Sequence, residues 1–277
     1  MVTLLVATTT DPASTNPANA LLAMHGWTPG ASLQGGIKSF ANQQVRLLQQ
    51  GKGIVEEDHL DVRWEEATGE EMDELIFFSK HTAVSNRPAL TVHPIGVPHP
   101  RQGEVPPQGG KPGWAAPPNP RIGPWLRLLK KIAQSHNLVP EFEITLEGTH
   151  HGPETNQPAM FVEISLGLGG EPAVGNWRMS LKKKVLLGIG GGHYAPRHVD
   201  IVMEDPSQSK AEANTAVIGG TWKQAIEEAF KTTKSAFPGG NIMAHLDQKS
   251  FKSWQKNAIT AFLADHNIKI GKPNDIL

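Results

Sequence analysis

The sequence predicts an α/β fold in which one mixed sheet carries helices on both faces. Short apolar runs of strand length alternate along the chain with amphipathic runs of helical length, and no internal repeat is found. The 277 residues are enough to bury a sizeable core. We therefore expect a single α/β domain over residues 1–277, with a proline- and glycine-rich excursion at about 94–120.

The first half of the chain supplies three predicted strands and one helix. Val2–Ala7 is an apolar run that predicts the first strand. A helix is expected over about Pro17–Met24, because Asn16 and Pro17 provide a cap and a first-turn proline. Buried strands are expected at Glu74–Phe78 and Leu90–Val92, separated by a polar connector.

The second half begins with the excursion, in which proline and glycine make regular structure improbable. Such a long loop is either a functional lid or a passive connector. Ile122–Asn137 then predicts an amphipathic helix whose apolar stripe holds Trp125, Leu128, Leu129 and Ile132. The remaining predicted elements are strands at Glu141–Glu147, Met160–Ser165, Lys184–Ile189 and Thr215–Ile218, and helices at Thr221–Lys234, capped by Thr221, and at about Ser250–Asn267.

Two segments place four histidines among helix-breaking residues directly after predicted strands. They are Glu147–Pro153 and Gly188–His198. Enzymes of the α/β class keep their chemistry where strands end and loops begin. His150 and His151 are adjacent, so only one of them faces a pocket unless the turn at Gly152 rotates the chain.

The histidines are candidates for a metal site as well as for structural hydrogen bonds. Neutral imidazole is the commonest protein ligand for zinc, and the nearby Glu147 and Glu163 could complete such a site. The spacing matches no standard zinc signature such as HExxH, so both interpretations stay open. The run Gly190–Gly192 is either a flexible connector or a set of NH groups that approach a phosphate or an oxyanion. His81 and His93 lie at other predicted strand ends and are secondary candidates for the same pocket.

Several runs of the sequence resemble the D-aminoacyl-tRNA deacylases of archaea and plants. These runs are Ala7–Ser14, Leu90–Gly96, Leu146–Pro153, Phe161–Ile164, Gly188–Arg197 and Leu246–Lys249. The resemblance therefore spans most of the chain. The segment Ser165–Gly170 departs from the compact Gly-Ser continuation of the archaeal members, which concerns the local loop rather than the family.

The resemblance implies a zinc-dependent esterase that removes D-amino acids, including N-alkyl adducts formed with aldehydes, from tRNA. It also implies a fold like that of phosphorylase or peptidyl-tRNA hydrolase. The ester is cut by a hydroxide, which zinc supplies by lowering the pKa of bound water to about 7. We assign catalysis to His151, His193 and Glu147, metal binding to His150, His151, His193 and Glu163, and substrate binding to Gly190, Gly191, Gly192, Tyr194, Arg197, His93 and His81.

For three residues near the Gly-rich run, the sequence gives more specific expectations. Arg197 suits a terminal phosphate, because its guanidinium fork pairs with phosphate bidentately. Tyr194, the only tyrosine, either stacks on the terminal adenine, donates to the leaving oxygen or serves as an amphipathic core residue. His198 is expected on the following strand.

Composition limits the partners and the compartment. The net charge is −1, with 26 basic and 27 acidic residues, so any tRNA contact must be local and DNA is not an expected partner. The candidate basic clusters are Arg121, Arg127, Lys130 and Lys131; Lys182, Lys183 and Lys184; and Lys249 and Lys252. Without cysteine there is no thiolate ligand or nucleophile. No apolar run approaches the roughly 18 residues of a membrane span, and the cytoplasm, with the nucleus as a second location, is expected.

Two other kinds of protein would also fit the histidines. A non-catalytic RNA-binding protein would use them structurally, but no clear basic surface or aromatic stacking motif supports it. A metal-dependent hydrolase of a small amide or peptide would use the same centre. A Ser-His-Asp hydrolase is less favoured because no GxSxG motif is present. The sequence makes no prediction of oligomeric state.

Overall fold

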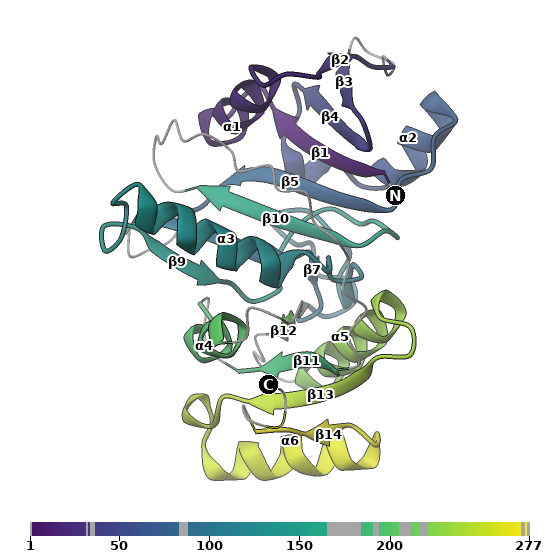
Figure 1. Cartoon of the computed structure of the whole chain (residues 1–277). Coiled ribbons are helices and arrows are strands. Elements are labelled where there is room, and N and C mark those ends of the chain that lie inside the picture. Colours follow the sequence, from purple (N-terminus) through teal and green to yellow (C-terminus); the bar gives the residue numbers. More distant parts are fainter. Residues whose placement is uncertain are drawn as a thin grey trace.

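The computed structural model describes residues 2–31, 33, 37–82, 88–164, 184–190, 194–204, 212–215, 221–272 and 275. Their strands form two main sheets, which lie one above the other with helices around them (Figure 1). The predicted α/β class with a mixed sheet and flanking helices is confirmed. The structure adds a second sheet that the sequence analysis did not separate from the first.

Within the described residues, the larger sheet has eight strands in the order β2-β3-β4-β1-β5-β10-β6-β9. Their bounds are β1 (Thr3–Thr8), β2 (Thr28–Pro29), β3 (Lys38–Asn42), β4 (Val45–Gln50), β5 (Glu74–Lys80), β6 (Ala89–Pro94), β9 (Glu143–Leu146) and β10 (Ala159–Ile164). The central strand β1 is parallel to β4 and β5, and β5 is parallel to β10. By contrast, β6 runs antiparallel to β10 and β3 antiparallel to β4, which makes the sheet mixed.

Both faces of this sheet are buried because successive residues of a strand point to opposite faces. In β1, Leu5 belongs to the core under helices α1 (Pro12–Leu22) and α3 (Ile122–Ser135). The next residue, Val6, belongs to the opposite core, which is covered by helix α2 (Leu60–Thr68) and the short helix η1 (Ile54–Glu56). This explains why the strands are continuous apolar runs in the sequence.

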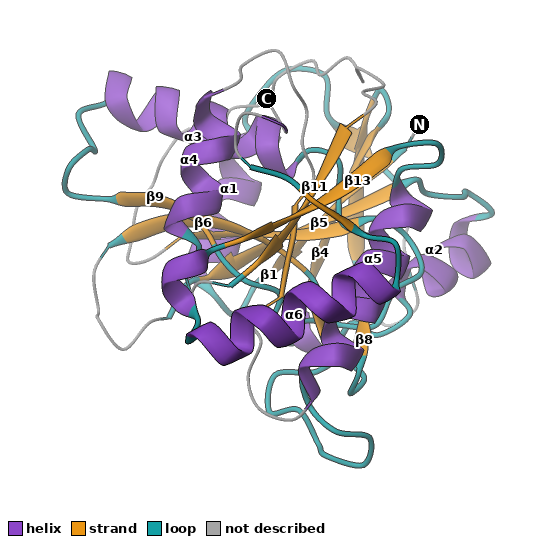
Figure 2. Ribbon diagram, turned by 90° about the horizontal axis from the view of Figure 1, so that it is seen from below, coloured by secondary structure: helices purple, strands orange, loops and turns teal. Residues whose placement is uncertain are grey.

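The smaller sheet is entirely parallel, with the strand order β12-β11-β13-β14. Its strands are β11 (Lys184–Ile189), β12 (Glu212–Thr215), β13 (Asn241–Leu246) and β14 (Lys269–Ile270). Helices α5 (Trp222–Ala236) and α6 (Ser253–Asp265) pack on one face, as Figure 2 shows from below. A one-turn helix η3 (Gln248–Ser250) connects β13 to α6. None of the described helices is long and apolar enough to cross a membrane.

Helix α4 (Pro196–Glu204) lies between the two sheets (Figure 1). Its Ile201 packs against β11 and β13 of the smaller sheet, whereas Val199 and Met203 pack against the core of the larger one. The expectation of a strand at His198 was wrong, because Pro196 opens a helix whose two sides both find apolar partners. The helix thus joins the two halves of the molecule.

Two other helices differ from their predicted form. Helix α1 begins at Pro12 rather than Pro17, because the Asp11 side chain accepts a hydrogen bond of 3.0 Å from the Ala13 NH and Pro12 follows this cap directly. In α3 the fully buried residues are Ile122, Gly123, Leu126 and Ala133 instead of the predicted stripe, whose members are only partly buried. Thr221 does precede α5, but its hydroxyl donates to the His99 carbonyl and makes no cap.

The excursion contains more order than the sequence predicted. Its strands β7 (Gly96–Val97) and β8 (Trp114–Ala115) pair as a small antiparallel ribbon. Between them the chain is exposed, and Val105 keeps 90% of its accessible surface. The Gln108 carbonyl accepts a hydrogen bond of 3.3 Å from the Gly152 NH, so the excursion packs on the loop that carries His150 and His151.

Candidate active site

Polar side chains gather on one face of the larger sheet, around β10 and β6. Because these strands are antiparallel, His93 lies directly opposite Phe161, and Glu163 follows two residues further along the same face. Glu147 comes immediately after β9, and its NH donates to the Val92 carbonyl of β6. His81 follows β5, and its NH donates to the Ile164 carbonyl at the end of β10. Four strands therefore deliver these four residues to one place.

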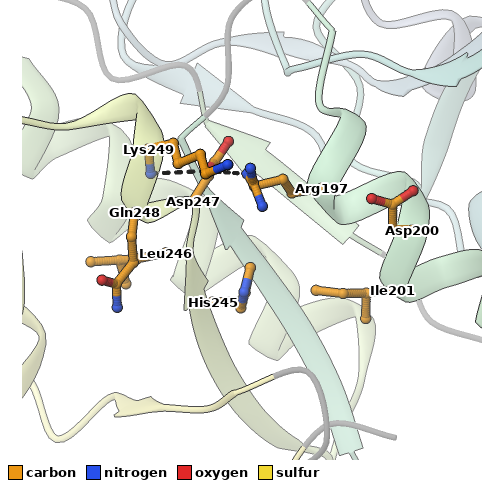
Figure 3. Close-up of a pocket in the computed structure, with 8 residues that line it drawn as sticks. All are labelled: Arg197, Asp200, Ile201, His245, Leu246, Asp247, Gln248 and Lys249. Atoms are coloured by element: carbon orange, nitrogen blue, oxygen red, sulfur yellow. Dashed lines mark hydrogen bonds and ion pairs between the residues drawn. The ribbon is translucent and has the colours of Figure 1, made fainter.

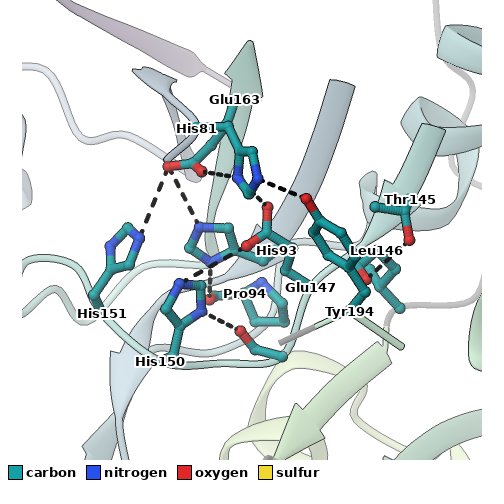
Figure 4. Close-up of polar contacts among 11 residues, drawn as sticks. His81, His93, Pro94, Thr145, Leu146, Glu147, His150, His151, Glu163 and Tyr194 are labelled. Atoms are coloured by element: carbon teal, nitrogen blue, oxygen red, sulfur yellow. Dashed lines mark hydrogen bonds and ion pairs between the residues drawn. The ribbon is translucent and has the colours of Figure 1, made fainter. Parts of the chain in front are cut away.

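The centre consists of two groups of possible metal ligands that adjoin each other (Figure 4). One group contains His93, His150 and His151, and the other contains His81, Glu147 and Glu163. In each group the candidate ligand atoms lie within 4.8 Å of one another. All of these side chains are buried except His150, which is partly buried.

Backbone carbonyls fix the orientation of the first group. His93 Nδ1 donates to the Pro94 carbonyl over 2.8 Å, and His150 Nδ1 donates to the Gly148 carbonyl over 2.5 Å. A carbonyl oxygen only accepts, so both rings carry a proton on Nδ1, and Nε2 is the atom available to a metal ion. In addition, His93 Nε2 and His151 Nδ1 are buried without a hydrogen-bond partner among the described residues. Buried polar atoms in this state call for an explanation, and a bound ion is one that fits imidazole nitrogens.

The second group is a chain of hydrogen bonds through His81. Its Nδ1 lies 3.0 Å from Glu147 Oε1 and 3.4 Å from Glu163 Oε2, and its Nε2 lies 2.8 Å from the Tyr194 hydroxyl. Burial alone would lower the pKa of His81, but the hydrogen bonds and charges of the two carboxylates raise that pKa to about 9. With both ring nitrogens protonated, His81 donates to a carboxylate and to Tyr194 at the same time.

Burial and neighbouring charges shift the pKa values of the histidines in this centre in opposite directions. Burial and the nearby positive charge of His93 and His150 lower the pKa of His151 to about 2, so His151 is neutral. Burial would raise the pKa of Glu163, but its contacts with His81 and His93 lower that pKa to about 2. The same contact with Glu163 outweighs burial and raises the pKa of His93. His151, a neutral imidazole beside the ionised Glu163, is in the state that binds a cation, whereas His93 would release a proton from Nε2 on binding one.

The loop after β9 turns both adjacent histidines toward this centre. The rings of His150 and His151 lie 4.3 Å apart, and each lies 4.7 Å from the ring of His93. The chain rotates at Gly152, whose φ of +115° is one that side-chain-bearing residues rarely adopt. The turn at Gly152 therefore rotates the chain, as the sequence analysis required for both histidines to face one pocket.

The other predicted residues fall at different places. Tyr194 forms an isolated bridge with Glu147 and contacts His81, at the centre. Arg197 lies at the start of α4 and pairs with Asp247 over 2.9 Å, away from the imidazoles. Gly190 has a φ of +108° and packs against Phe251. Gly191, Gly192 and His193 lie outside the described residues, so their assigned roles remain predictions.

The structure also shows where His198 and several residues of the predicted basic clusters lie. His198 is buried in α4, with its ring 5.2 Å from His245, and it does not join the centre. Arg121 pairs over 2.6 Å with the buried Glu74, which is a structural role. Of the three consecutive lysines, Lys182 and Lys183 lie outside the described residues. Lys249 lines a pocket next to Arg197.

The structure brings His81 and His93, which were secondary candidates from the sequence, into the centre itself. His93 is the last polar residue of β6 and His81 directly follows β5, and these positions at strand ends were the available signal. Their importance depends on the antiparallel insertion of β6 beside β10, which brings strand ends far apart in the sequence onto one face. Hydrophobic periodicity carries no information about that pairing.

A buried set of imidazoles and carboxylates on the face of an α/β sheet is a candidate metal centre of the kind that metal-dependent hydrolases use. The model of the D-aminoacyl-tRNA deacylase family matches residues 68–167 and 173–271. The chain belongs to the D-aminoacyl-tRNA deacylase family, which confirms the resemblance seen in the sequence.

Relatives agree with this membership, and one solved structure shares the fold. A D-aminoacyl-tRNA deacylase of Arabidopsis thaliana is 60% identical, with 99% of each chain covered. One of Methanosarcina acetivorans is 28% identical, over 98% of this chain and 92% of the relative. A crystal structure of a conserved protein of unknown function matches with a TM-score of 0.79 at 23% identity, covering 99% of this chain and 96% of the other, and it supports the fold alone.

Proposed function

We propose that this chain hydrolyses the ester that links a D-amino acid to the terminal adenosine of tRNA, and releases free D-amino acid and tRNA. N-alkyl adducts of the same D-amino acids are included among the proposed substrates. The observation that carries this proposal is the group of His93, His150 and His151 beside two ionisable carboxylates, in a member of the deacylase family. We place the reaction in the cytoplasm, where aminoacyl-tRNA is used.

The residues present fit a zinc ion. Three imidazoles form a common ligand set of catalytic zinc sites, and His93 and His150 each have Nδ1 anchored to a carbonyl, as zinc-binding histidines usually do. His93, His150 and His151 would hold the ion, with the Glu163 carboxylate beside them. When bound, zinc supplies a hydroxide at neutral pH and polarises the ester carbonyl.

The carboxylates and Tyr194 would manage the protons of the reaction. Glu163 Oε1 lies 3.8 Å from His151 Nε2 and 3.6 Å from His93 Nε2, which places an acceptor for a water proton beside the imidazoles. On the other side, Glu147 holds His81, and His81 holds the Tyr194 hydroxyl. Tyr194 is then positioned to donate its proton to the ribose oxygen that leaves.

The proposal is tested by amino-acid release from matched D- and L-aminoacyl-tRNA, before chelation, after chelation and after zinc is restored. We expect cleavage of the D-ester alone, lost with the chelator and regained with zinc. His151→Ala should abolish turnover with little loss of fold, whereas His136→Ala, at an exposed histidine after α3, should retain it. Folded, zinc-loaded protein that cleaves neither ester would contradict the proposal.

A further inference from the structure

A second polar site lies at the carboxyl end of β13 in the smaller sheet. It is a pocket of about 390 Å³ between the start of α4 and helix η3 (Figure 3). Its lining among the described residues consists of Arg197, Asp200, Ile201, His245, Leu246, Asp247, Gln248 and Lys249. Carboxyl ends of parallel strands are the usual place for ligands in open α/β sheets. The volume suits a single small ligand or one nucleotide, rather than a duplex.

Asp247 holds Arg197 in a fixed orientation within this pocket. Its Oδ1 accepts from Arg197 Nε over 2.9 Å. The same carboxylate accepts hydrogen bonds from the Lys249 NH and the Ser250 hydroxyl, and these contacts fix its position. Bonding through Nε leaves the two terminal nitrogens of the guanidinium group without another ion pair in the described part of the chain. These nitrogens form the fork that binds phosphate oxygens.

Further side chains complete a site for an anionic ligand. The Lys249 and Arg197 side chains extend toward one another across Asp247 (Figure 3), which places two positive charges at the same end of the pocket. His245 lines the wall, and its Nδ1 is buried without a hydrogen-bond partner in the described residues. Asp200, an exposed residue of α4, offers an acceptor for a sugar hydroxyl.

The pocket is connected to the candidate active site by a short segment. Tyr194 contacts His81 in the centre, and Arg197 is only three residues further along the chain. Three Cα–Cα steps of 3.8 Å allow at most about 11 Å between these two residues. The Ala195 NH between them donates to the Leu146 carbonyl, which fixes the segment to the end of β9. A strand of RNA with its terminal ester at the imidazoles would therefore pass this pocket.

We propose that the pocket is a nucleotide subsite, in which Arg197 and Lys249 bind a backbone phosphate of the RNA strand that ends at the ester. The inference rests on the proposed function. Asp200 accepts a ribose hydroxyl of the same nucleotide, which distinguishes RNA from DNA. With a net charge of −1, the chain has no bulk attraction for RNA, so local contacts of this kind must provide it.

The experiment compares two substrates that share the reacting bond. D-aminoacyl-tRNA carries the phosphates, and the D-aminoacyl ester of adenosine carries none. For Lys249→Ala and for Arg197→Lys, we expect the ratio of kcat/KM on the tRNA ester to kcat/KM on the adenosine ester to fall at least about tenfold, mainly through KM. Lys234→Ala, which removes an equal charge from the exposed end of α5, should leave that ratio at the wild-type value.

A salt titration adds a readout that a purely structural role would not change. The slope of log(1/KM) against log[salt] on the tRNA ester should become shallower by about 0.7 in Lys249→Ala, because one phosphate contact is lost. An unchanged ratio and slope in both pocket variants, with wild-type activity on the two esters, would overturn the subsite alone. Wild-type protein that cleaves neither ester would overturn the proposed function, and the subsite with it.

Discussion

At the scale of single residues, the hydroxyl of Tyr194 is the group with the most specific role in the proposed reaction, as the proton donor. It is held by His81, which is itself held by Glu147, so its position is set by a chain of hydrogen bonds rather than by packing alone. Tyr194→Phe removes the hydroxyl and keeps the ring. We expect kcat on D-aminoacyl-tRNA to fall about 100-fold, within the range of lost general acids, with KM little changed.

The assay for this variant is steady-state kinetics, supported by a thermal unfolding curve to show that the fold is retained. The matched control keeps the centre and changes another exposed aromatic residue, Trp254→Phe in α6, which is 68% exposed. Wild-type kcat in Tyr194→Phe would exclude the hydroxyl from proton transfer and leave Tyr194 as a packing residue.

His198 gives the stability of the protein a dependence on pH. Its burial, followed by the nearby positive charge of His245, lowers its pKa from 6.5 to about 4 in the folded chain. Between these two values the unfolded chain binds more protons, so the stabilisation is complete above pH 6.5 and is lost as the pH falls toward 4. We expect this residue alone to account for about 2–3 kcal/mol of the free energy of unfolding over that interval.

Urea unfolding at several pH values between 7.5 and 4 measures this contribution. In His198→Gln the free energy of unfolding should fall less steeply with decreasing pH, even if its value at pH 7.5 is lower. His266→Gln, at a partly exposed histidine after α6, should keep the wild-type slope. The same slope in His198→Gln would show that another group carries the pH dependence.

At the residue scale, the sequence predicted which side chains could react but not how they combine. His150, His151 and Glu147 were candidates because they follow an apolar run, and Glu163 because it lies near them in the sequence. The bond between His81 and Glu147 was not predictable, because it joins residues 66 positions apart through the order of four strands. Nor did any pattern indicate that Arg197 pairs with Asp247.

At the scale of elements, the turn at Gly152 positions the histidine loop. A Cβ atom at Gly152 would lie 2.6 Å from Phe161 Cε2 and 2.7 Å from Ile95 Cγ2, and the φ of +115° is itself strained for alanine. We expect Gly152→Ala to lower the free energy of unfolding by about 2 kcal/mol or more. The rate of D-aminoacyl-tRNA hydrolysis should fall by more than the loss of folded protein explains, because the neighbouring His151 is displaced from His93.

Gly69→Ala is the matched control for this substitution. Gly69 ends α2 with a φ of +71°, but a Cβ atom there would meet nothing within 4 Å. It should lower the free energy of unfolding by about 1 kcal/mol, the conformational term alone, and leave turnover at the wild-type rate. Chemical denaturation and D-aminoacyl-tRNA hydrolysis on both variants separate the two effects; equal losses would show that packing at Gly152 is unimportant.

Most elements were predictable because their local signals agreed with their tertiary environment. Strands β1, β5, β6, β10 and β11 are apolar runs buried on both faces, and α5 has an apolar stripe. Strands β3 and β4 were not predicted, because they are only partly buried and carry polar residues. Helix α4 was not predicted either, and its apolar residues contact different sheets, which the sequence does not reveal.

At the scale of the whole molecule, α4 and the Tyr194–Arg197 segment join the sheet that carries the imidazoles to the sheet that carries the pocket. Neither sheet contains both sites. The division into two sheets was not visible in the sequence, because strand length and apolar character are the same in each. The family match extends over both halves of the chain, at residues 68–167 and 173–271.

Binding of zinc should stabilise the whole fold, because His93 comes from β6 and His150 and His151 come from the connection between β9 and β10. These ligands are together only in the folded chain, so an ion at 100 times its dissociation constant adds about 2.7 kcal/mol to the free energy of unfolding. We expect the Tm of chelator-treated protein to rise by about 5 °C or more when zinc is restored. His93→Gln should lose this rise and His136→Gln should keep it. An equal rise in His93→Gln would place the stabilising zinc elsewhere, and the buried nitrogens His93 Nε2 and His151 Nδ1, which lack a hydrogen-bond partner among the described residues, would then require another explanation.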